Sequence, residues 1–312
     1  MREPASLLRD GAAAGRRPLA AYGEAAVLLA RTLYADVRAG DARALPSWAG
    51  LRPPAQPPLF VVGAPRSGTT FLGACIGAVP GISYHYEPPV VRAALRHANL
   101  GEWPLEFTAT IYRVTYRLLR LFDAERPTTR VADKTPENVF GLPMLAETFP
   151  GASIVHIVRD GRDAALSLRE RPWLLGVNSP KPGASPRGPR GAAARFWVEP
   201  HRAEEFAATS DLHRCLWAWR RYTEAGLAGR SLGSRYLEVR YEDLVASPQA
   251  TGRRLADFLE LGDGPGRGAL LSALAEARTD SVGRWRAAFS AADRALADRE
   301  IGPLLARLGY PA

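Results

Sequence analysis

The sequence feature that most constrains the fold is an apolar segment that leads through a glycine-rich loop into a helix. Residues 59–62, Leu-Phe-Val-Val, have the pattern of a short buried strand, and residues 71–76 have that of the first turns of a helix. Residues 63–70 between them read Gly-Ala-Pro-Arg-Ser-Gly-Thr-Thr. Such a loop offers backbone N–H groups and a helix N-terminus to an anion. The sequence therefore predicts an anion-binding loop.

The loop departs from the nucleotide-binding pattern G-x-x-x-x-G-K-[ST] at one position. Thr69 stands where that pattern has the lysine that neutralises the β- and γ-phosphates of a triphosphate. One cationic side chain, Arg66, lies inside the loop instead. The backbone is still expected to bind an anion, whereas the missing lysine argues against triphosphate hydrolysis. A P-loop phosphoryl transferase of the nucleotide kinase type stays open as an alternative.

The rest of the chain alternates between strand and helix patterns. Further strands are expected at residues 83–86, 130–133, 153–158 and 235–239, and helices at 104–124, 143–149, 163–169, 212–227 and 248–261. Residues 153–158 are nearly all apolar or β-branched, which is typical of a central strand in a parallel sheet. The pattern predicts an α/β protein with a three-layer, P-loop-like fold, in which helices flank a central, mostly parallel sheet.

One domain is expected, with two additions. Residues 1–52 are rich in alanine and arginine, and we expect them to form a helical N-terminal extension packed on the core. Residues 53–312 are expected to form a single α/β domain. A segment rich in proline, glycine and arginine, at about 176–206, interrupts the pattern. Both a surface insertion and an ordered lid over the site remain open for it.

Composition excludes several classes of protein. Hydrophobic residues make up 46% of the chain and charged residues 23%, which is enough apolar material for a globular core. Two cysteines, Cys75 and Cys215, cannot form a disulfide framework or a thiolate cluster and fit a reducing compartment. The five histidines include no H-x-x-x-H pair, so we expect no metal site.

The net charge of +9 comes almost entirely from arginine, because Lys134 and Lys181 are the only lysines. The arginines are spread along the chain without a basic block interleaved with aromatic residues, so no nucleic-acid partner is expected. No window of 18 apolar residues is found, so we expect no membrane span. No secretory signal is found either, so we expect a cytoplasmic location. Because lysine is so scarce here, a lysine within a well-patterned segment is expected to be there for its own chemistry.

A second candidate anion site follows the strand at 153–158. Arg159 ends that strand and Ser167 lies eight residues later in the next helix, so a fork-shaped cation and a hydroxyl can share one anion. Together with residues 65–70, this layout resembles the sulfotransferases that use 3′-phosphoadenosine 5′-phosphosulfate (PAPS), closest to their tyrosylprotein and carbohydrate branch. A third segment, Arg-Tyr-Glu-Asp-Leu at 240–244, is similar to a family segment near the cofactor.

The resemblance implies which residues bind the cofactor. The 5′-phosphosulfate loop corresponds to Pro65, Arg66, Ser67, Gly68, Thr69 and Thr70. Arg159 and Ser167 would hold the 3′-phosphate, and Tyr241 the adenosine. Ser281 and Arg284 lie in a late segment whose family counterpart reaches the phosphates. A helix N-cap for Ser281 and a core position for Tyr241 are the alternatives. The product would be adenosine 3′,5′-bisphosphate (PAP), and no metal would be required.

Catalysis of sulfuryl transfer to a hydroxyl needs a base near the sulfate, because the attacking hydroxyl must lose its proton. Residues 85–89, His-Tyr-Glu-Pro-Pro, offer two candidates, Glu87 and His85. The resemblance favours Glu87. Lys134 stands in a Lys-x-Pro context like that of the tyrosylprotein branch, where the lysine and Arg66 would neutralise charge on the oxygen that leaves sulfur.

The resulting hypothesis is a PAPS-dependent sulfotransferase of the EC 2.8.2 type. The acceptor hydroxyl is expected on a small molecule, a sugar or a lipid headgroup, and the attack is expected in line with the leaving group. A secreted protein tyrosine fits poorly because no secretory signal is found. The sequence leaves a homodimer open. A nucleic-acid-binding module is the third hypothesis.

Overall fold

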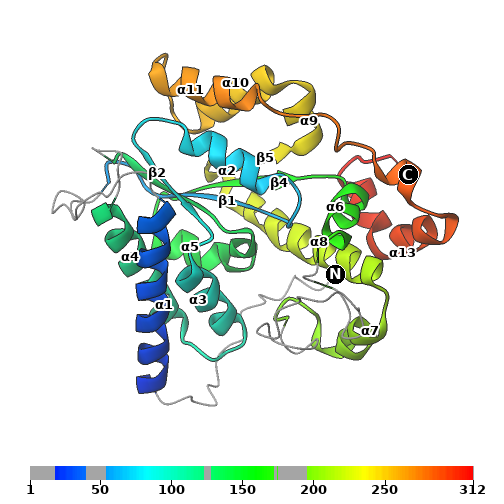
Figure 1. The fold of residues 1–312 in the computed structure, drawn as a ribbon, viewed down its shortest axis with the longest axis horizontal. Coiled ribbons are helices and arrows are strands. Elements are labelled where there is room, and N and C mark those ends of the chain that lie inside the picture. Colours follow the sequence, from blue (N-terminus) through cyan, green and yellow to red (C-terminus); the bar gives the residue numbers. More distant parts are fainter. Residues whose placement is uncertain (1–17, 40–53, 123–127, 172–173, 175–194, 312) are drawn as a thin grey trace.

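The computed structural model of the chain describes residues 18–39, 54–122, 128–171, 174 and 195–311 (Figure 1). Most of the predicted insertion at 176–206 lies outside these described residues, as do residues 1–17 and 40–52 of the predicted N-terminal extension.

Five strands of the described residues form one parallel sheet in the order β2-β3-β1-β4-β5. The strands are β1 (Leu59–Gly63), β2 (Ile82–Tyr86), β3 (Arg130–Lys134), β4 (Ser153–Val158) and β5 (Tyr236–Arg240). Each lies within one or two residues of its predicted position. β1 and β3 are buried along their whole length, as expected for strands covered on both faces. The predicted α/β fold is confirmed.

Helices cover both faces of the sheet (Figure 1). One face carries α2 (Thr69–Gly77), α10 (Pro248–Phe258) and α11 (Pro265–Leu274), with the short α9 (Tyr241–Ala246) beside them. The other carries α3 (Pro89–Asn99), α4 (Leu105–Leu119), α5 (Leu142–Thr148), α6 (Gly161–Arg169) and α8 (Asp211–Leu227). Alternate residues of β1 point into separate cores, Leu59 and Val61 into the first and Phe60 and Val62 into the second. This alternation produces the three predicted layers.

The remaining helices lie around these layers. They are α1 (Pro18–Ala39), α7 (Ala203–Ala208), α12 (Trp285–Ala288) and α13 (Ala291–Arg307), with 3-10 turns at η2 (Arg120–Phe122), η3 (Pro136–Gly141), η6 (Pro200–Arg202) and η7 (Ala228–Arg235). None of the helices in the described ranges combines the length and the apolar character needed to cross a bilayer.

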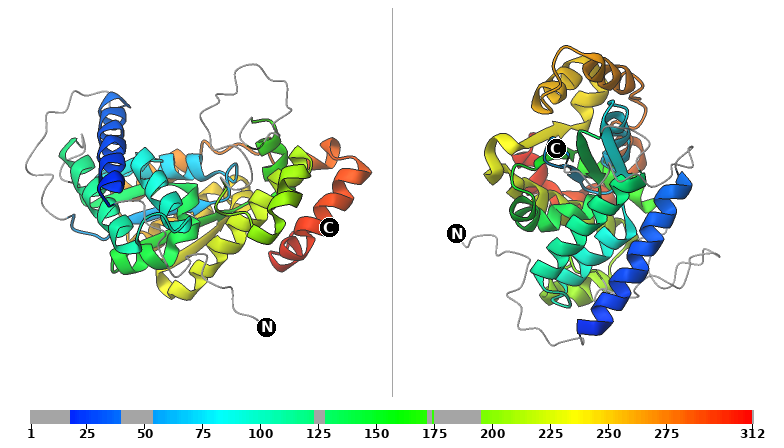
Figure 2. Two further views of the ribbon diagram at one scale, coloured as in Figure 1. Left: turned by 90° about the horizontal axis from the view of Figure 1, so that it is seen from below. Right: turned by 90° about the vertical axis from the view of Figure 1, so that its left-hand side faces the viewer.

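Helix α1 packs against α3 and α4 (Figure 2). Ala21 and Ala25 are buried in the same core as those helices. Thr32 is also buried, and its hydroxyl accepts a hydrogen bond from the backbone N–H of Val90 at 3.0 Å while donating to Leu28 O at 2.9 Å. α1 is therefore attached to the first turn of α3 by a polar contact as well as by packing.

Candidate active site

The loop at 63–70 joins β1 to α2 through a backbone path that requires glycine. Gly68 has φ = 93°, and a Cβ atom there would lie 2.6 Å from Cδ2 of Tyr241. Gly63 has φ = 148°, and its Cβ would lie 2.4 Å from the carbonyl oxygen of Ile157. Arg66 itself has φ = 69°, a left-handed conformation that is strained for a residue with a side chain. The sequence therefore forces a tight turn at the carboxyl end of the sheet.

Ser67 gives this loop an unused hydrogen-bonding group. Its side chain is fully buried, and its Oγ has no hydrogen-bond partner within the described part of the chain. A buried polar atom without a partner costs about 1–3 kcal/mol, and a ligand or a water molecule that pairs with it removes this cost. The loop therefore fits an anionic group that accepts a hydrogen bond from this hydroxyl.

The second predicted anion site lies in direct contact with the first. Nε of Arg66 donates to Oγ of Ser167 at 3.0 Å, and Nη1 of Arg159 donates to the carbonyl oxygen of Arg66 at 2.8 Å. Arg159 also donates to the carbonyl oxygen of Ser281, while its buried Nε has no partner among the described atoms. Segments about 100 residues apart in the sequence thus meet at one point.

Positive charge is concentrated here. Burial, followed by the nearby guanidinium groups of Arg171 and Arg159, lowers the pKa of Arg66 below its usual value. A lowered pKa means that the protonated form is destabilised by its surroundings, and a bound anion would relieve that penalty. The electrostatics of this region therefore favour an anionic ligand.

Tyr241 connects the loop to the late segment. Its ring packs against Gly68, the guanidinium carbon of Arg159 lies 4.7 Å from the ring centre, and its hydroxyl is 2.6 Å from Oγ of Ser281. Asp163 holds this late segment in place by accepting hydrogen bonds from the backbone of Gly283 at 2.6 Å and of Trp285 at 3.0 Å. Ser281 therefore lies beside the loop and makes no cap contact.

Arg284 lies apart from these residues. Its guanidinium forms an exposed ion pair with Glu170 at 2.8 Å, where both side chains are nearly half exposed. No contact joins it to the loop, to Arg159 or to Ser281 within the described ranges.

Glu87 and Lys134 form an ion pair at the ends of β2 and β3. Lys134 Nζ lies 2.5 Å from Oε1 of Glu87 and donates to Oγ1 of Thr70 at 3.1 Å. The lysine side chain is buried and lies over the ring of Tyr86, with Nζ 3.7 Å from the ring centre. Glu87 has φ = 45° and remains one-fifth exposed. The ammonium group thus contacts both the carboxylate and the last residue of the loop.

A second cation, which was not predicted from the sequence, lies on the other side of Glu87. Arg92, on α3, approaches Oε2 of Glu87 at 3.4 Å and donates two hydrogen bonds to Oε1 of Glu137, at 2.8 and 3.2 Å. Glu87 therefore lies between Lys134 and Arg92. The i, i+5 spacing of Glu87 and Arg92 was uninformative because residues 88–89, Pro-Pro, obscured the start of α3.

His85 lies on a different face of the sheet from Lys134. In the register of β2 with β3, His85 pairs with Asp133 and Tyr86 pairs with Lys134, so successive side chains alternate between the faces. His85 is buried, and its Nε2 lies 2.8 Å from Oγ of Ser83. His85 therefore does not share a face of the sheet with Lys134, the residue that contacts Glu87.

Asp133 belongs to a buried hydrogen-bond chain below the site. Its carboxylate accepts from the hydroxyl of Tyr116 at 2.7 Å and from Nδ2 of Asn138 at 3.2 Å, and Asn138 in turn accepts from Tyr112 at 2.7 Å. Burial raises the pKa of Asp133 to about 6. The chain anchors β3, and with it Lys134, to helix α4. No group of three or more histidine, cysteine or acidic side chains suited to a metal occurs among the described residues.

Comparisons with known proteins show what the segment that holds this site is similar to. Residues 57–173 match the sulfotransferase family. Protein-tyrosine sulfotransferase 1 of Danio rerio is 25% identical over 218 residues, which cover 66% of this chain and 53% of that protein. An uncharacterized protein of Aquifex aeolicus (strain VF5) is 27% identical over 225 residues, 67% of this chain and 26% of that protein. The chain thus spans about half of the first relative and about a quarter of the second.

The fold agrees with this result. The crystal structure of sulfotransferase STF9 from Mycobacterium avium superposes with a TM-score of 0.53 at 15% identity, covering 93% of this chain and 85% of that one. The matched segment holds the loop, Glu87, Lys134, Arg159 and Ser167. Residues 57–173 thus match the sulfotransferase family, and the chain shares its fold with a sulfotransferase, in agreement with the resemblance found in the sequence. The kinase alternative is not favoured.

Proposed function

We propose that this protein transfers a sulfuryl group from PAPS to an acceptor hydroxyl on a small molecule, a sugar or a lipid headgroup. The observation that carries the proposal is the convergence of three elements. The loop with its unpaired Ser67 hydroxyl, the Arg66–Ser167–Arg159 group and the Glu87–Lys134 ion pair all adjoin one another at the carboxyl ends of the strands. Ligands of open parallel sheets bind at this edge.

The proposed cofactor contacts follow from these positions. The backbone of residues 65–70 and the Ser67 hydroxyl would hold the 5′-phosphosulfate at the N-terminus of α2. Ser167 and the free Nε of Arg159 would bind the 3′-phosphate, which requires Arg66 to release Ser167 and turn toward the sulfate. Tyr241 would pack against the adenosine side of the nucleotide, with Ser281 beside it.

Chemistry would proceed by in-line attack of the acceptor oxygen on sulfur. The new O–S bond forms as the bond from sulfur to the bridging oxygen breaks, and PAP leaves with that electron pair. Glu87 accepts the acceptor proton, and Lys134, with Arg66, neutralises the leaving oxygen. Lys134 is paired with Glu87 at 2.5 Å, and the proposal requires the ammonium to turn toward the sulfate so that the carboxylate is free to accept the proton.

Glu87 is a better candidate for the base than His85. Glu87 is partly exposed and contacts Lys134, whereas the side chain of His85 is buried on the opposite face of the sheet. A base must reach the proton that it removes. The residues in place provide positive charge without a metal, so metal-free catalysis belongs to the proposal.

Substitution of Glu87 by glutamine tests the base directly. Glu87→Gln should bind PAP with unchanged affinity and lose turnover by about 100-fold or more, because the amide cannot accept the proton. PAP release is followed with labelled PAPS and a panel of hydroxylated acceptors, and PAP affinity by calorimetry. Glu276→Gln, at an exposed position, is the matched control. Full activity of Glu87→Gln would remove the base assignment, while tight binding of magnesium ATP in place of PAP would revive the kinase.

A further inference from the structure

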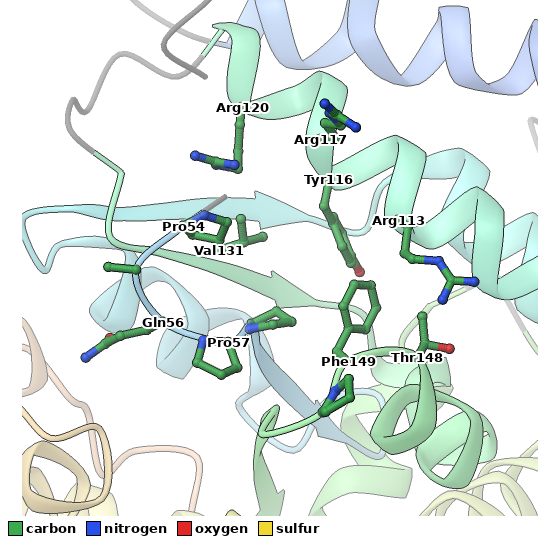
Figure 3. Close-up of a pocket in the computed structure, with 13 residues that line it drawn as sticks. Pro54, Gln56, Pro57, Arg113, Tyr116, Arg117, Arg120, Val131, Thr148 and Phe149 are labelled. Carbon is green, nitrogen blue, oxygen red and sulfur yellow. The ribbon is translucent and has the colours of Figure 1, made fainter. Parts of the chain in front are cut away.

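A pocket of about 550 Å³ opens at the edge of the sheet opposite the candidate active site (Figure 3). Its lining comes from segments that lie at the amino ends of β1, β3 and β4, together with the second half of α4. Pockets that bind small molecules usually have volumes of about 300–1,000 Å³. The cavity is therefore large enough for a ligand of its own, and none of the proposed sulfuryl-transfer residues lines it.

One rim of this pocket carries three arginines. Arg113, Arg117 and Arg120 are spaced by four and three residues along α4 and η2, so they lie on one face of the helix (Figure 3). No aspartate or glutamate is among the lining residues. Arg113 and Arg117 are exposed, and no carboxylate of the described chain pairs with either. Like charges at this spacing repel one another, and an anion would offset the repulsion.

The rest of the lining is mostly apolar and aromatic. The rings of Tyr116 and Phe149 lie next to each other in the pocket, with centroids 5.8 Å apart and planes tilted by 45° (Figure 3). Behind them, Phe60 packs on both rings, at 6.2 Å from Tyr116 and 5.8 Å from Phe149. Val131 and Pro57 extend this surface. Such a wall favours a flat hydrocarbon body, because burial of apolar area drives its binding.

We propose that this pocket binds a small organic anion with a ring-shaped apolar body and one acidic group. The acidic group contacts the guanidinium groups of Arg113 and Arg117, and the ring system lies against Tyr116 and Phe149. The pocket is a second site, separate from the nucleotide site, and its occupation does not depend on the proposed transfer reaction.

A matched pair of fluorescent probes tests this site. The first is 8-anilinonaphthalene-1-sulfonate, which has an aromatic body and a sulfonate, and the second is uncharged N-phenyl-1-naphthylamine. The sulfonate should show one saturable binding site on the full chain. In the double variant Arg113→Gln/Arg117→Gln its affinity should fall about tenfold or more, because charge-assisted hydrogen bonds are lost. The affinity of the uncharged probe should stay unchanged.

The controls make the test decisive. Arg253→Gln, at an exposed position on α10, should bind the sulfonate like the wild type, and Arg113→Lys/Arg117→Lys should retain most of the affinity because the charge is kept. Thermal unfolding confirms that every variant is folded. The absence of saturable binding, equal sulfonate affinity in the glutamine variant, or displacement of the probe by saturating PAP would each overturn the proposal.

Discussion

At the scale of single residues, Lys134 is the side chain whose environment most constrains its role. It is fully buried, its ammonium contacts Glu87, Thr70 and the ring of Tyr86, and it is one of only two lysines in the sequence. A buried ion pair adds little net stability when apolar residues of similar volume can replace it. Its position beside the loop therefore fits a chemical role better than a structural one.

Lys134→Met separates these two roles. The methionine keeps most of the volume, and Glu87 stays partly exposed and keeps Arg92 as a partner, so the melting temperature should fall by only a few degrees. Turnover should fall about 100-fold or more, because the leaving oxygen loses its cation. PAP release and thermal unfolding are the measurements. A variant that is both stable and active would show that the lysine is not catalytic.

Asp133 gives a prediction for the pH dependence of stability. The folded protein holds a proton on this carboxyl up to about pH 6, whereas in the unfolded chain it is lost near the ordinary value of 3.8. Between these values the native state binds more protons, so the free energy of unfolding falls as pH rises from about 4 to about 6. At 1.36 kcal/mol per pKa unit, the contribution is at most about 3 kcal/mol.

The Asp133→Asn variant lacks this titration. As the pH rises from 4 to 7, the unfolding free energy of the wild type should therefore fall steadily relative to that of the variant. Asp263→Asn, at a fully exposed position, is the control and should show no such trend. Denaturant unfolding at several pH values measures the difference. A difference that is independent of pH would mean that Asp133 is ionised normally in the folded protein.

At the scale of elements, the five strands could be predicted, whereas several helices, among them α3, α11 and α13, could not. Uninterrupted apolar runs such as residues 153–158 indicated strands, and the observed β4 has the limits predicted for that run. α3 was not predicted, because residues 88–89, Pro-Pro, suggested a turn. In the structure Pro89 is the first residue of the helix, where proline is favoured since its missing N–H would have no partner there.

Replacement by alanine should change the stability in opposite directions at Gly68, in the loop at 63–70, and at Gly268, outside it. Gly68→Ala places a Cβ 2.6 Å from Tyr241 at φ = 93°, so we expect a loss of about 1–3 kcal/mol in stability and at least about tenfold weaker PAP binding. Gly268→Ala lies within α11 with open space around it and should stabilise the protein by about 0.5–1 kcal/mol. Calorimetry and denaturant unfolding measure both effects, and similar behaviour of the two variants would contradict the account of the loop.

At the scale of the whole molecule, most residues of the candidate site could be predicted from the sequence, but their contacts could not. The loop, Arg159 and Ser167 could be found from local patterns, because each follows a strand end. The direct Arg66–Ser167 hydrogen bond depends on the strand order, which places β1 beside β4. The separation of His85 from Lys134 depends on the register of β2 with β3. Neither order nor register is encoded in a local pattern.

Charge is also organised at this scale. The net charge of +9 includes two groups of arginines on opposite edges of the sheet, one at Arg66 and Arg159 and one at Arg113 and Arg117. In the sequence, Arg66 and Arg159 are distinguished by the motifs in which they stand, whereas Arg113 and Arg117 are not distinguished from the other arginines. Only the topology, with all described strands parallel, assigns the first pair to the carboxyl edge and the second to the amino edge.

The central claim is that one doubly anionic nucleotide lies between the loop and the Arg159–Ser167 pair, and a crystal structure with PAP tests it most directly. The account predicts the 5′-phosphate at residues 65–70 within hydrogen-bond distance of the Ser67 hydroxyl. It predicts the 3′-phosphate at Arg159 and Ser167, with Ser167 released from Arg66. A 3′-phosphate that contacts neither residue, or a nucleotide bound elsewhere on the protein, would contradict it.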